Sequence, residues 1–342
     1  MGISAAARGV FANTMVVIGL FGGFPEITLA AAPQAQVQAP GFYRMRLGEF
    51  EITVLSDGTH PFPDAEVLTQ AVDGSSKRVK LFQAHPEEAR SALAAVDLTA
   101  PTEGSINAFL INTGKQLILV DSGAGSLYGI CCGHLLSNLK AAGYRPEQVD
   151  EILLTHLHAD HVGGIAPNGN VAFPNAIVRA SKIDADYWLN EANEKAAPNF
   201  LGPMFKGAMA SLKPYIAAKR FVPFSGDVEI AQGINAIGAP GHTPGHTLYR
   251  VTSDGQTLLL WGDIVHVAPI QFNDPSITVE YDSDEKVAQA TRLKIFDLAA
   301  SETDWIGAAH ISFPGLGHVV KRGSTFVWIP AEYTTRLAPL TH

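Results

Sequence analysis

The hydrophobic pattern divides most of the chain into short apolar runs and longer mixed segments. Apolar runs at residues 50–55, 106–111 and 116–120 predict strands. Residues 134–142 predict a helix, because a periodic apolar segment there ends at Gly143. Strands and helices therefore alternate along the chain, which is typical of an α/β fold.

Two later segments have a less regular pattern. A helix is predicted from Ser283 to about Ala300, because Ser283 can cap its amino end and acidic residues follow in the first turn. Residues 166–225 carry proline, glycine and aromatic residues without a strand period, so we expect them to form a lid and pocket wall. One face of the predicted helix should consist of Val287, Thr291, Ile295 and Leu298.

Four candidate metal ligands follow directly after the apolar run 152–154. The motif is His156-Leu-His158-Ala-Asp160-His161, in a chain that has 12 histidines. His156 and His158 are two residues apart and point to the same side of an extended segment, whereas the other two belong to the next turn. Because the ligands point in two directions, this spacing indicates a site for two ions. Imidazole and carboxylate ligands are compatible with several transition metals.

Three more candidate ligands lie beside strand-like runs. His246 precedes the run 247–251, Asp263 follows the run 258–261, and His310 follows the run 305–309. Ligands at strand ends can converge at one edge of a sheet. A bridging carboxylate offsets the repulsion between two cations about 3.5 to 4 Å apart. The predicted sets are His156, His158 and His246 for one ion, Asp160, His161 and His310 for the other, and Asp263 as the bridge.

The order of these motifs resembles that of the metallo-β-lactamase superfamily. The resembling motifs are HxHxDH ending at His161, TPGH ending at His246, GD ending at Asp263, and a histidine after a strand, His310. Segments that begin at Asp121, Gln271, Asp282 and Ala309 resemble the methyl parathion hydrolase and lactonase branch. The resemblance implies an αβ/βα four-layer sandwich, in which two mixed β-sheets are flanked by helices. We expect this hydrolase domain to occupy residues 42–342.

The resemblance also implies a binuclear hydrolase that attacks esters with a metal-bridging hydroxide. The expected cofactors are two divalent ions, zinc first, with Mn, Co or Fe as alternatives, because such ions lower the pKa of bound water toward about 7. Asp160 and Asp263 are the predicted catalytic carboxylates. The substrate would be a lactone, a phosphotriester of the methyl parathion kind, or both. A lactone needs a proton donor for its leaving group, and Asp160, His266 and Tyr128 are all candidates.

Aromatic residues near the motifs are predicted to contact the substrate, because ligand pockets are mostly apolar. Core packing is the alternative for each of them. Tyr128 occupies a position where the related branch has phenylalanine. The predicted substrate-binding residues are Tyr128, Trp188, Phe205, His266 and Phe272.

The remaining histidines are given other roles. His242 belongs to the turn before His246, and we expect it to support the site without binding metal. His310 is favoured over His318 as a ligand because it directly follows an apolar run. Residues without a motif, such as His60, His85 and His134, are expected to be solvated or to lie in the core.

The amino-terminal segment predicts export. Arg8 precedes an apolar stretch at residues 9–24, and residues 29–32 offer small side chains for cleavage. We expect residues 1–32 to be a signal peptide and residues 33–41 a linker, with a membrane anchor as the alternative. The mature protein would be periplasmic or secreted, without stable membrane insertion.

The two cysteines, Cys131 and Cys132, are neighbours in the sequence. Adjacent cysteines rarely form a relaxed disulfide, because the geometry of the bond favours more distant Cα atoms. We therefore expect them to act as packing residues.

The composition of the chain limits the classes of molecule that it is expected to bind. The formal net charge is −9, which disfavours nucleic acids and other polyanions. The expected partner is a small, neutral, largely apolar ester, and the resemblance also implies a homodimer. Two alternatives stay open: a mononuclear iron dioxygenase of the persulfide type, which would hold one metal per chain, and a β-lactamase. The zinc β-lactamases that have cysteine at the bridging position differ from this chain, which has Asp263 there.

Overall fold

The computed structural model describes residues 32, 34–72, 77–302 and 304–337. Apart from Ala32, the predicted signal peptide lies outside these residues. No helix within the described ranges is long and apolar enough to cross a membrane.

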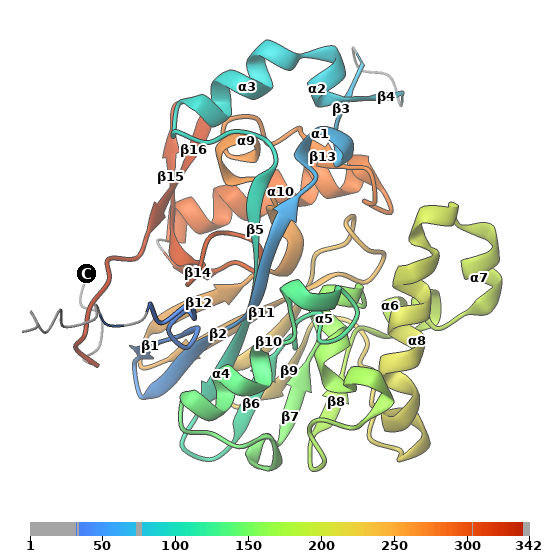
Figure 1. Ribbon diagram of the computed structural model, residues 1–342, viewed down its shortest axis with the longest axis vertical. Coiled ribbons are helices and arrows are strands. Elements are labelled where there is room, and N and C mark those ends of the chain that lie inside the picture. Colours follow the sequence, from blue (N-terminus) through green and yellow to red (C-terminus); the bar gives the residue numbers. More distant parts are fainter. Residues whose placement is uncertain (1–31, 33, 73–76, 303, 338–342) are drawn as a thin grey trace, which may run out of the picture. The chain divides into compact units, whose positions relative to one another are not determined.

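Two mixed β-sheets form the centre of the domain (Figure 1). The first contains, in spatial order, β1 (Phe42–Leu47), β2 (Phe50–Phe62), β5 (Thr102–Asn112), β6 (Leu117–Val120), β7 (Glu151–Leu153) and β8 (Ile177–Arg179). The second contains β16 (Thr325–Pro330), β15 (Leu316–Arg322), β14 (Trp305–Gly307), β12 (Gln256–Leu260), β11 (Thr247–Ser253), β10 (Ile234–Gly238) and β9 (Val228–Ala231). Neighbours are antiparallel except β6–β7, β7–β8 and β12–β14, which are parallel.

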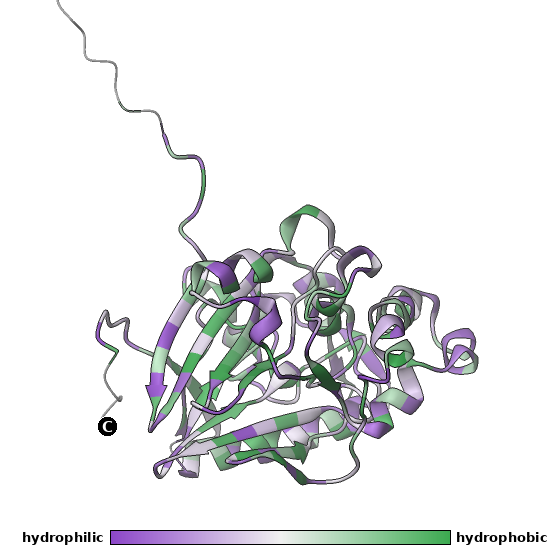
Figure 2. Cartoon of the chain, turned by 90° about the horizontal axis from the view of Figure 1, so that it is seen from below, coloured by the Kyte–Doolittle hydropathy of each residue, from purple (hydrophilic) through white to green (hydrophobic). Residues whose placement is uncertain are grey.

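The two sheets pack face to face through apolar side chains. Val54, Phe109 and Val120 of the first sheet belong to the same buried cluster as Tyr249 and Leu260 of the second. Figure 2 shows hydrophobic residues recurring along the strands. Burial of these branched and aromatic side chains explains why the predicted strand runs fold into sheets.

Helices cover the outer faces of both sheets. On the first sheet, Leu110 and Leu119 pack in one cluster with Leu139 of α4 (Leu135–Ala141) and Leu212 of α8 (Gly202–Ala217). On the second sheet, a separate cluster joins the strands to α10 (Glu285–Glu302). The order of layers is helix, sheet, sheet, helix, so the predicted α/β sandwich is confirmed.

A small third sheet lies outside this sandwich. It consists of β13 (Thr278–Val279), β3 (Leu68–Ala71) and β4 (Arg78–Lys80). Its strands are too short to show a strand period, which is why the sequence did not predict them. The neighbouring short helices are α1 (Asp64–Val67), α2 (Leu81–Ala84), α3 (Pro86–Ala94) and α9 (Ala268–Gln271).

The predicted details of α10 need correction. The side chain of Asp284 accepts a hydrogen bond from the amide of Val287 at 3.0 Å, so Asp284 caps the helix where Ser283 was predicted to do so. Val287, which was predicted on the apolar face of this helix, is 37% exposed. The buried face of α10 includes Arg292, which donates hydrogen bonds to three backbone carbonyls. A hydrophobic pattern cannot predict a buried arginine. The buried residues are Ala288, Arg292, Ile295, Phe296 and Ala299.

The segment 166–225 is also more regular than predicted. Besides β8, it contains α6 (Lys182–Trp188), α7 (Glu191–Ala196) and the long helix α8. Buried Phe205, Leu212 and Tyr215 attach α8 to the first sheet. Most of this segment therefore supports the core, and it is not only a lid.

The two cysteines form a disulfide bond with each other, so the prediction that they are only packing residues was wrong. Gly129 and Gly133 flank the pair with positive φ angles of 75° and 89°. Glycine adopts this backbone conformation without a steric penalty. The two glycines therefore allow the backbone to turn sharply on either side of the disulfide.

Candidate metal centre

The candidate ligands lie after the ends of three strands. The motif residues follow β7 and continue into α5 (Ala159–Val162), Asp263 follows β12, and His310 follows β14. Within the described residues, side chains that could hold a metal form three overlapping buried groups. These groups are His156, His158, His242 and Asp263; Asp160, His161 and His310; and Asp263, His266 and His310.

Asp263 lies between the two predicted sets of ligands. Its Oδ1 atom is 3.0 Å from Nε2 of His161. Its Oδ2 atom is 3.1 Å from Nε2 of His310 and 3.6 Å from Nε2 of His156. This carboxylate therefore reaches histidines of both sets, which is the arrangement that a bridging ligand requires.

The structure differs from the prediction in how it arranges His242 and His246. Nε2 of His242 lies 3.2 Å from Oδ2 of Asp263 and 3.0 Å from Nδ1 of His158. Nε2 of His246 accepts a hydrogen bond of 3.0 Å from the backbone amide of Asp263. His242, predicted only to support the site, is thus grouped with the candidate ligands, while His246 lies beside them.

Hydrogen bonds that the Nδ1 atoms donate to oxygen acceptors orient several of these imidazoles. His161 contacts the Asp121 carboxylate at 2.8 Å, and His310 contacts the Ser105 carbonyl at 2.9 Å. His242 contacts Asp282 at 2.7 Å. An Nδ1 proton held in this way leaves Nε2 free to bind a metal, as is common around metal sites. Asp121 and Asp282 belong to segments of the family resemblance, but nothing in the sequence assigned them this role.

A buried carboxylate connects the two loops that carry histidines. Asp184 of α6 accepts hydrogen bonds from the amide of Leu157 at 3.3 Å, the hydroxyl of Thr243 at 2.8 Å and the amide of Gly245 at 2.6 Å. It is fully buried, and its burial raises the pKa of Asp184 to about 6. No sequence signal pointed to this residue, because it lies in a segment without a motif.

Burial and neighbouring charges act differently on the individual ligands. For His161, His242 and His310 burial alone would lower the pKa, but Asp263 and the neighbouring carboxylates outweigh that effect and raise the pKa, for His242 to about 9. Burial lowers the pKa of His156 and His158 well below the usual value, and that of His246 to about 3. Burial alone would raise the pKa of Asp263, but His161 and the other histidines around it outweigh that effect and hold the pKa well below its usual range. Neutral imidazole and ionised carboxylate are the metal-binding forms.

Several buried polar atoms fit a bound metal. Nε2 of His156, His158 and His161 and Oδ1 of Asp263 are buried and make no hydrogen bond. Buried polar atoms nearly always have a partner, and a group left without one costs free energy. Divalent cations would satisfy this set of nitrogen and oxygen donors, so the residues present fit a metal centre.

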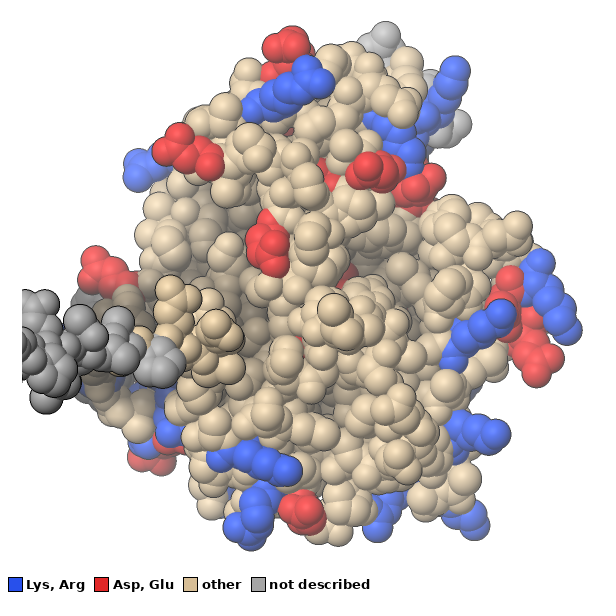
Figure 3. Space-filling model, in the orientation of Figure 1, with Lys and Arg blue, Asp and Glu red and all other residues tan. Residues whose placement is uncertain are grey.

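A cavity of about 350 Å³ opens onto these groups. It is lined on one side by His158, Asp160, Asp263 and His310. The remaining wall consists of His60, Pro61, Phe62, Pro63, Tyr128, Met204, His266 and Tyr281. Figure 3 shows that charged side chains lie mostly around the periphery of the face drawn there, while its centre is largely uncharged.

The structure separates the five predicted substrate-binding residues into two groups. Tyr128 and His266 line the cavity. Trp188, Phe205 and Phe272 are buried in the core. The ring of Trp188 meets the ring of His158 edge-on at 4.8 Å and packs against Phe205 at 4.4 Å, so these two residues support a candidate ligand from behind.

Several lining residues were not predicted. His60 was expected to be solvated or in the core, but it lines the cavity and its ring lies 5.8 Å from that of Tyr128. Phe62, Met204 and Tyr281 also had no sequence signal. Each comes from a different part of the chain, and only the folded structure brings them together. His318 lies outside the groups and contacts the Asp304 carbonyl, so the preference for His310 agrees with the geometry.

The fold and the buried histidine and aspartate groups define a metal-dependent hydrolase scaffold. Residues 101–310 match the family model described as the metallo-beta-lactamase superfamily. The chain belongs to this superfamily. The predicted family is therefore confirmed.

Curated relatives match in part. An N-acyl homoserine lactonase from Bacillus cereus is 27% identical over 160 residues, which cover 47% of this chain and 56% of the relative. Ribonuclease TTHA0252 from Thermus thermophilus is 26% identical over 190 residues, which cover 53% of this chain and 40% of the relative. The chain spans about half the length of the curated relatives it matches.

Solved structures match over a larger share. The hydrolase AbOPH of the beta lactamase superfamily is 38% identical, with a TM-score of 0.78 over 87% of this chain and 100% of that one. AidC, a dizinc quorum-quenching lactonase in complex with the product N-hexnoyl-L-homoserine, is 28% identical, with a TM-score of 0.74 over 86% of this chain and 99% of that one. Both support the sandwich fold described above.

Proposed function

We propose that this protein is a binuclear metal-dependent lactonase that opens neutral lactones with an apolar substituent, such as acyl homoserine lactones. The observation that carries the proposal is the position of Asp263, which contacts candidate ligands of both sets beside a partly apolar cavity. The similarity to AidC, a dizinc lactonase, supports both the metal number and the substrate class.

Zinc is the proposed metal, because the donors are mainly imidazole with carboxylate, a set that zinc accepts. Asp160, His161 and His310 would hold one ion. His156 and His158, together with His246 or His242, would hold the other, and Asp263 would bridge them. When bound, two such ions supply a nucleophilic hydroxide at neutral pH and polarise the oxygen that gains charge.

The residues of the cavity would then bind and orient the lactone. Phe62 and Met204 provide apolar contact for the substituent, while Tyr128 lies beside Asp160. Burial of the phenol hydroxyl, together with the Asp160 carboxylate, raises the pKa of Tyr128 well above its usual value although the side chain as a whole is partly exposed, so the phenol keeps its proton at neutral pH. Tyr128 is the proposed donor to the ring oxygen that leaves, since it lines the cavity and keeps its proton, whereas burial lowers the pKa of His266 to about 4 and leaves that imidazole neutral.

The lactone is favoured over a nucleic acid substrate, although a ribonuclease is among the relatives. The formal net charge of −9 repels a polyanion. A phosphotriester with a nitrophenolate leaving group is the second candidate, supported by the resemblance to the methyl parathion hydrolase branch. Such a leaving group needs no proton donor, which separates the two substrates experimentally.

The test is a substrate screen of the purified, zinc-loaded protein. We expect an N-acyl homoserine lactone to be hydrolysed faster than a nitrophenyl phosphotriester, an aryl ester and a chromogenic cephalosporin. The metal content, measured on the same sample, should be two ions per chain. A single ion per chain in fully active protein, or retained turnover after complete removal of metal by a chelator, would contradict the proposal.

Export is proposed for the same protein. The apolar stretch at residues 9–24 and the small residues at 29–32 support a signal peptide, and the Cys131–Cys132 disulfide fits an oxidising compartment. Cell fractionation and amino-terminal sequencing of the exported protein would test it. The homodimer stays a prediction of the family resemblance.

A further inference from the structure

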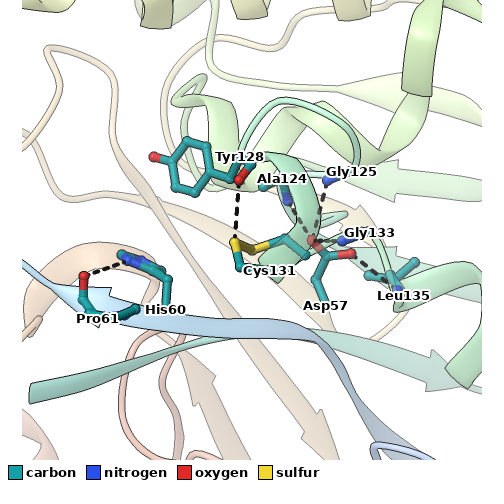
Figure 4. The surroundings of a disulfide bond; sticks show 10 residues. Asp57, His60, Pro61, Ala124, Gly125, Tyr128, Cys131, Gly133 and Leu135 are labelled. Atoms are coloured by element: carbon teal, nitrogen blue, oxygen red, sulfur yellow. Dashed lines mark hydrogen bonds between the residues drawn. A yellow bond between two sulfur atoms is a disulfide. The ribbon is translucent and has the colours of Figure 1, made fainter.

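The disulfide lies in a loop beside the candidate metal centre. The loop, residues 125–133, leaves the end of the first sheet and returns before α4, and Figure 4 shows Cys131 between Tyr128 and Asp57. Tyr128, within this loop, lines the cavity. A redox-sensitive bond and a cavity residue are thus three positions apart on one short segment.

Both ends of the loop are fixed by one buried carboxylate. Oδ2 of Asp57 accepts hydrogen bonds from the amides of Ala124 at 2.9 Å, Gly125 at 3.2 Å and Gly133 at 3.0 Å. Oδ1 accepts another from Leu135 at 3.1 Å. Asp57 is fully buried, so these charge-assisted bonds are not weakened by solvent. The ends of the loop therefore form a fixed frame.

The tip of the loop is less constrained than its ends. Leu127 still packs against α8, where a Cβ added at Gly207 would come within 3.0 Å of its side chain. Beyond it, Ile130 is fully exposed and Tyr128 is 36% exposed. Gly129, with its positive φ of 75°, lies directly between Tyr128 and the exposed end. The disulfide closes a small covalent ring at this point and so restricts the backbone of the tip.

The disulfide also contacts the backbone of Tyr128. Sγ of Cys131 lies 3.4 Å from the carbonyl oxygen of Tyr128. In the disulfide this sulfur has no proton to donate, whereas a reduced thiol would have one. Behind the pair, a Cβ at Gly58 would approach the Cys131 carbonyl oxygen to 2.2 Å, so β2 packs closely against the cysteine backbone. Opening the ring can therefore move the tip only away from β2.

We propose that Cys131–Cys132 is a reducible site for a dithiol, either a small molecule or a dithiol protein, and that its redox state sets the position of Tyr128 in the cavity. In the oxidised form the ring holds the tip, and Tyr128 lies next to His60 and Asp160. In the reduced form the tip gains backbone freedom and Tyr128 spends less time against the substrate.

The chemistry is an ordinary thiol–disulfide exchange. A thiolate of the dithiol attacks Sγ of Cys131, the more exposed cysteine, and the Cys132 sulfur leaves as a thiolate. The second thiol of the reductant then resolves the mixed disulfide. Two electrons and two protons pass to the protein, which ends with two thiols, and the reductant ends as a disulfide. The metal ligands take no part in this exchange.

The first test measures the bond and the loop without using catalysis. Metal-loaded protein is reduced with a dithiol, freed of reductant and alkylated, and its metal content is measured to exclude chelation. We expect alkylation at both cysteines only after reduction, together with faster amide exchange at residues 126–132 and unchanged exchange in α5. Free thiols in the air-oxidised protein, or identical exchange in both forms, would overturn the proposal.

The second test uses lactone hydrolysis and therefore rests on the proposed function. The Cys131→Ser/Cys132→Ser variant, which needs no reductant, should reproduce the reduced protein, with KM raised about two- to tenfold and metal content unchanged. Combined with Tyr128→Ala, it should raise KM no further than Tyr128→Ala alone. An unchanged KM, or fully additive effects, would overturn the link to Tyr128. If no lactone is hydrolysed, the proposed function fails, but the alkylation and amide-exchange measurements of the first test still show whether the disulfide is a redox site.

Discussion

The metal-binding side of the cavity and its remaining wall are held in different ways. Buried carboxylates fix the metal-binding side: Asp121 holds His161, and Asp184 joins the loops that carry the histidines. In the remaining wall the side chains meet through ring contacts, such as His60 with Tyr128 at 5.8 Å and Phe62 with His266 at 5.8 Å, and the Asp57 carboxylate fixes only the ends of the loop that carries Tyr128. Charged hydrogen bonds define geometry more tightly than ring contacts do, so the first region suits metal chemistry and the second suits substrate selection.

The strongest test of this contrast removes the bridging charge. Asp263→Asn keeps the shape of the side chain but takes away the carboxylate that contacts both ligand sets. We expect activity to fall by more than about a hundredfold, because partners that only orient ligands already cost ten- to a hundredfold. Metal content by elemental analysis should fall together with the rate. Full retention of both would show that Asp263 is not the bridge.

The next test concerns the carboxylate behind the ligands. Asp184→Asn replaces one of the two carboxylate oxygens by an NH2 group, which donates hydrogen bonds and does not accept them. The side chain can then no longer accept all three hydrogen bonds. We expect zinc affinity to fall about ten- to a hundredfold, measured by competition with a chelator, while KM for the lactone changes little. Asp186→Asn is the matched control, because Asp186 lies on the same helix but is exposed and pairs with Lys182. Equal losses in both variants would mean that α6 itself, and not Asp184, matters.

The same contrast explains what could be predicted from the sequence. The motif from His156 to His161 and the strand-end residues Asp263 and His310 could be proposed as ligands from the sequence, because candidate metal ligands of this kind cluster at short fixed spacings after apolar runs. Asp184 and His60 were missed, because their roles depend on contacts with residues far away in the sequence.

The positions of His242 and His246 show what sequence spacing cannot decide, because the structure groups His242 with the candidate ligands where His246 was predicted. Both lie in one turn of five residues, so the sequence cannot tell which imidazole points at Asp263. The sandwich itself was predictable from the alternating pattern and the family resemblance. The small third sheet was not, since its strands have two to four residues.

A weaker effect is expected on the substrate wall. Tyr128→Ala removes a ring that lines the cavity, and we expect KM to rise about two- to tenfold with unchanged metal content. Tyr128→Phe separates the ring from the hydroxyl: if the phenol donates a proton to the leaving group, kcat for the lactone should fall while that for a nitrophenyl ester stays the same. Loss of metal in either variant would contradict the division between the two regions.

The smallest effect is expected at Trp188, which the sequence placed on the substrate wall and the structure places behind His158. Trp188→Phe shortens the ring that supports this histidine, so we expect unfolding to become easier by about 1 to 2 kcal/mol through a small cavity. Zinc affinity should fall slightly, and the ratio of the variant's KM to the KM of the unmutated protein should be the same for lactones with short and long substituents. Val178→Ala, a buried truncation in the same core cluster, is the control for stability loss alone. A KM ratio that depends on substituent length in Trp188→Phe but not in the control would instead assign this residue to the substrate wall, because a side chain that acts through His158 does not contact the substituent.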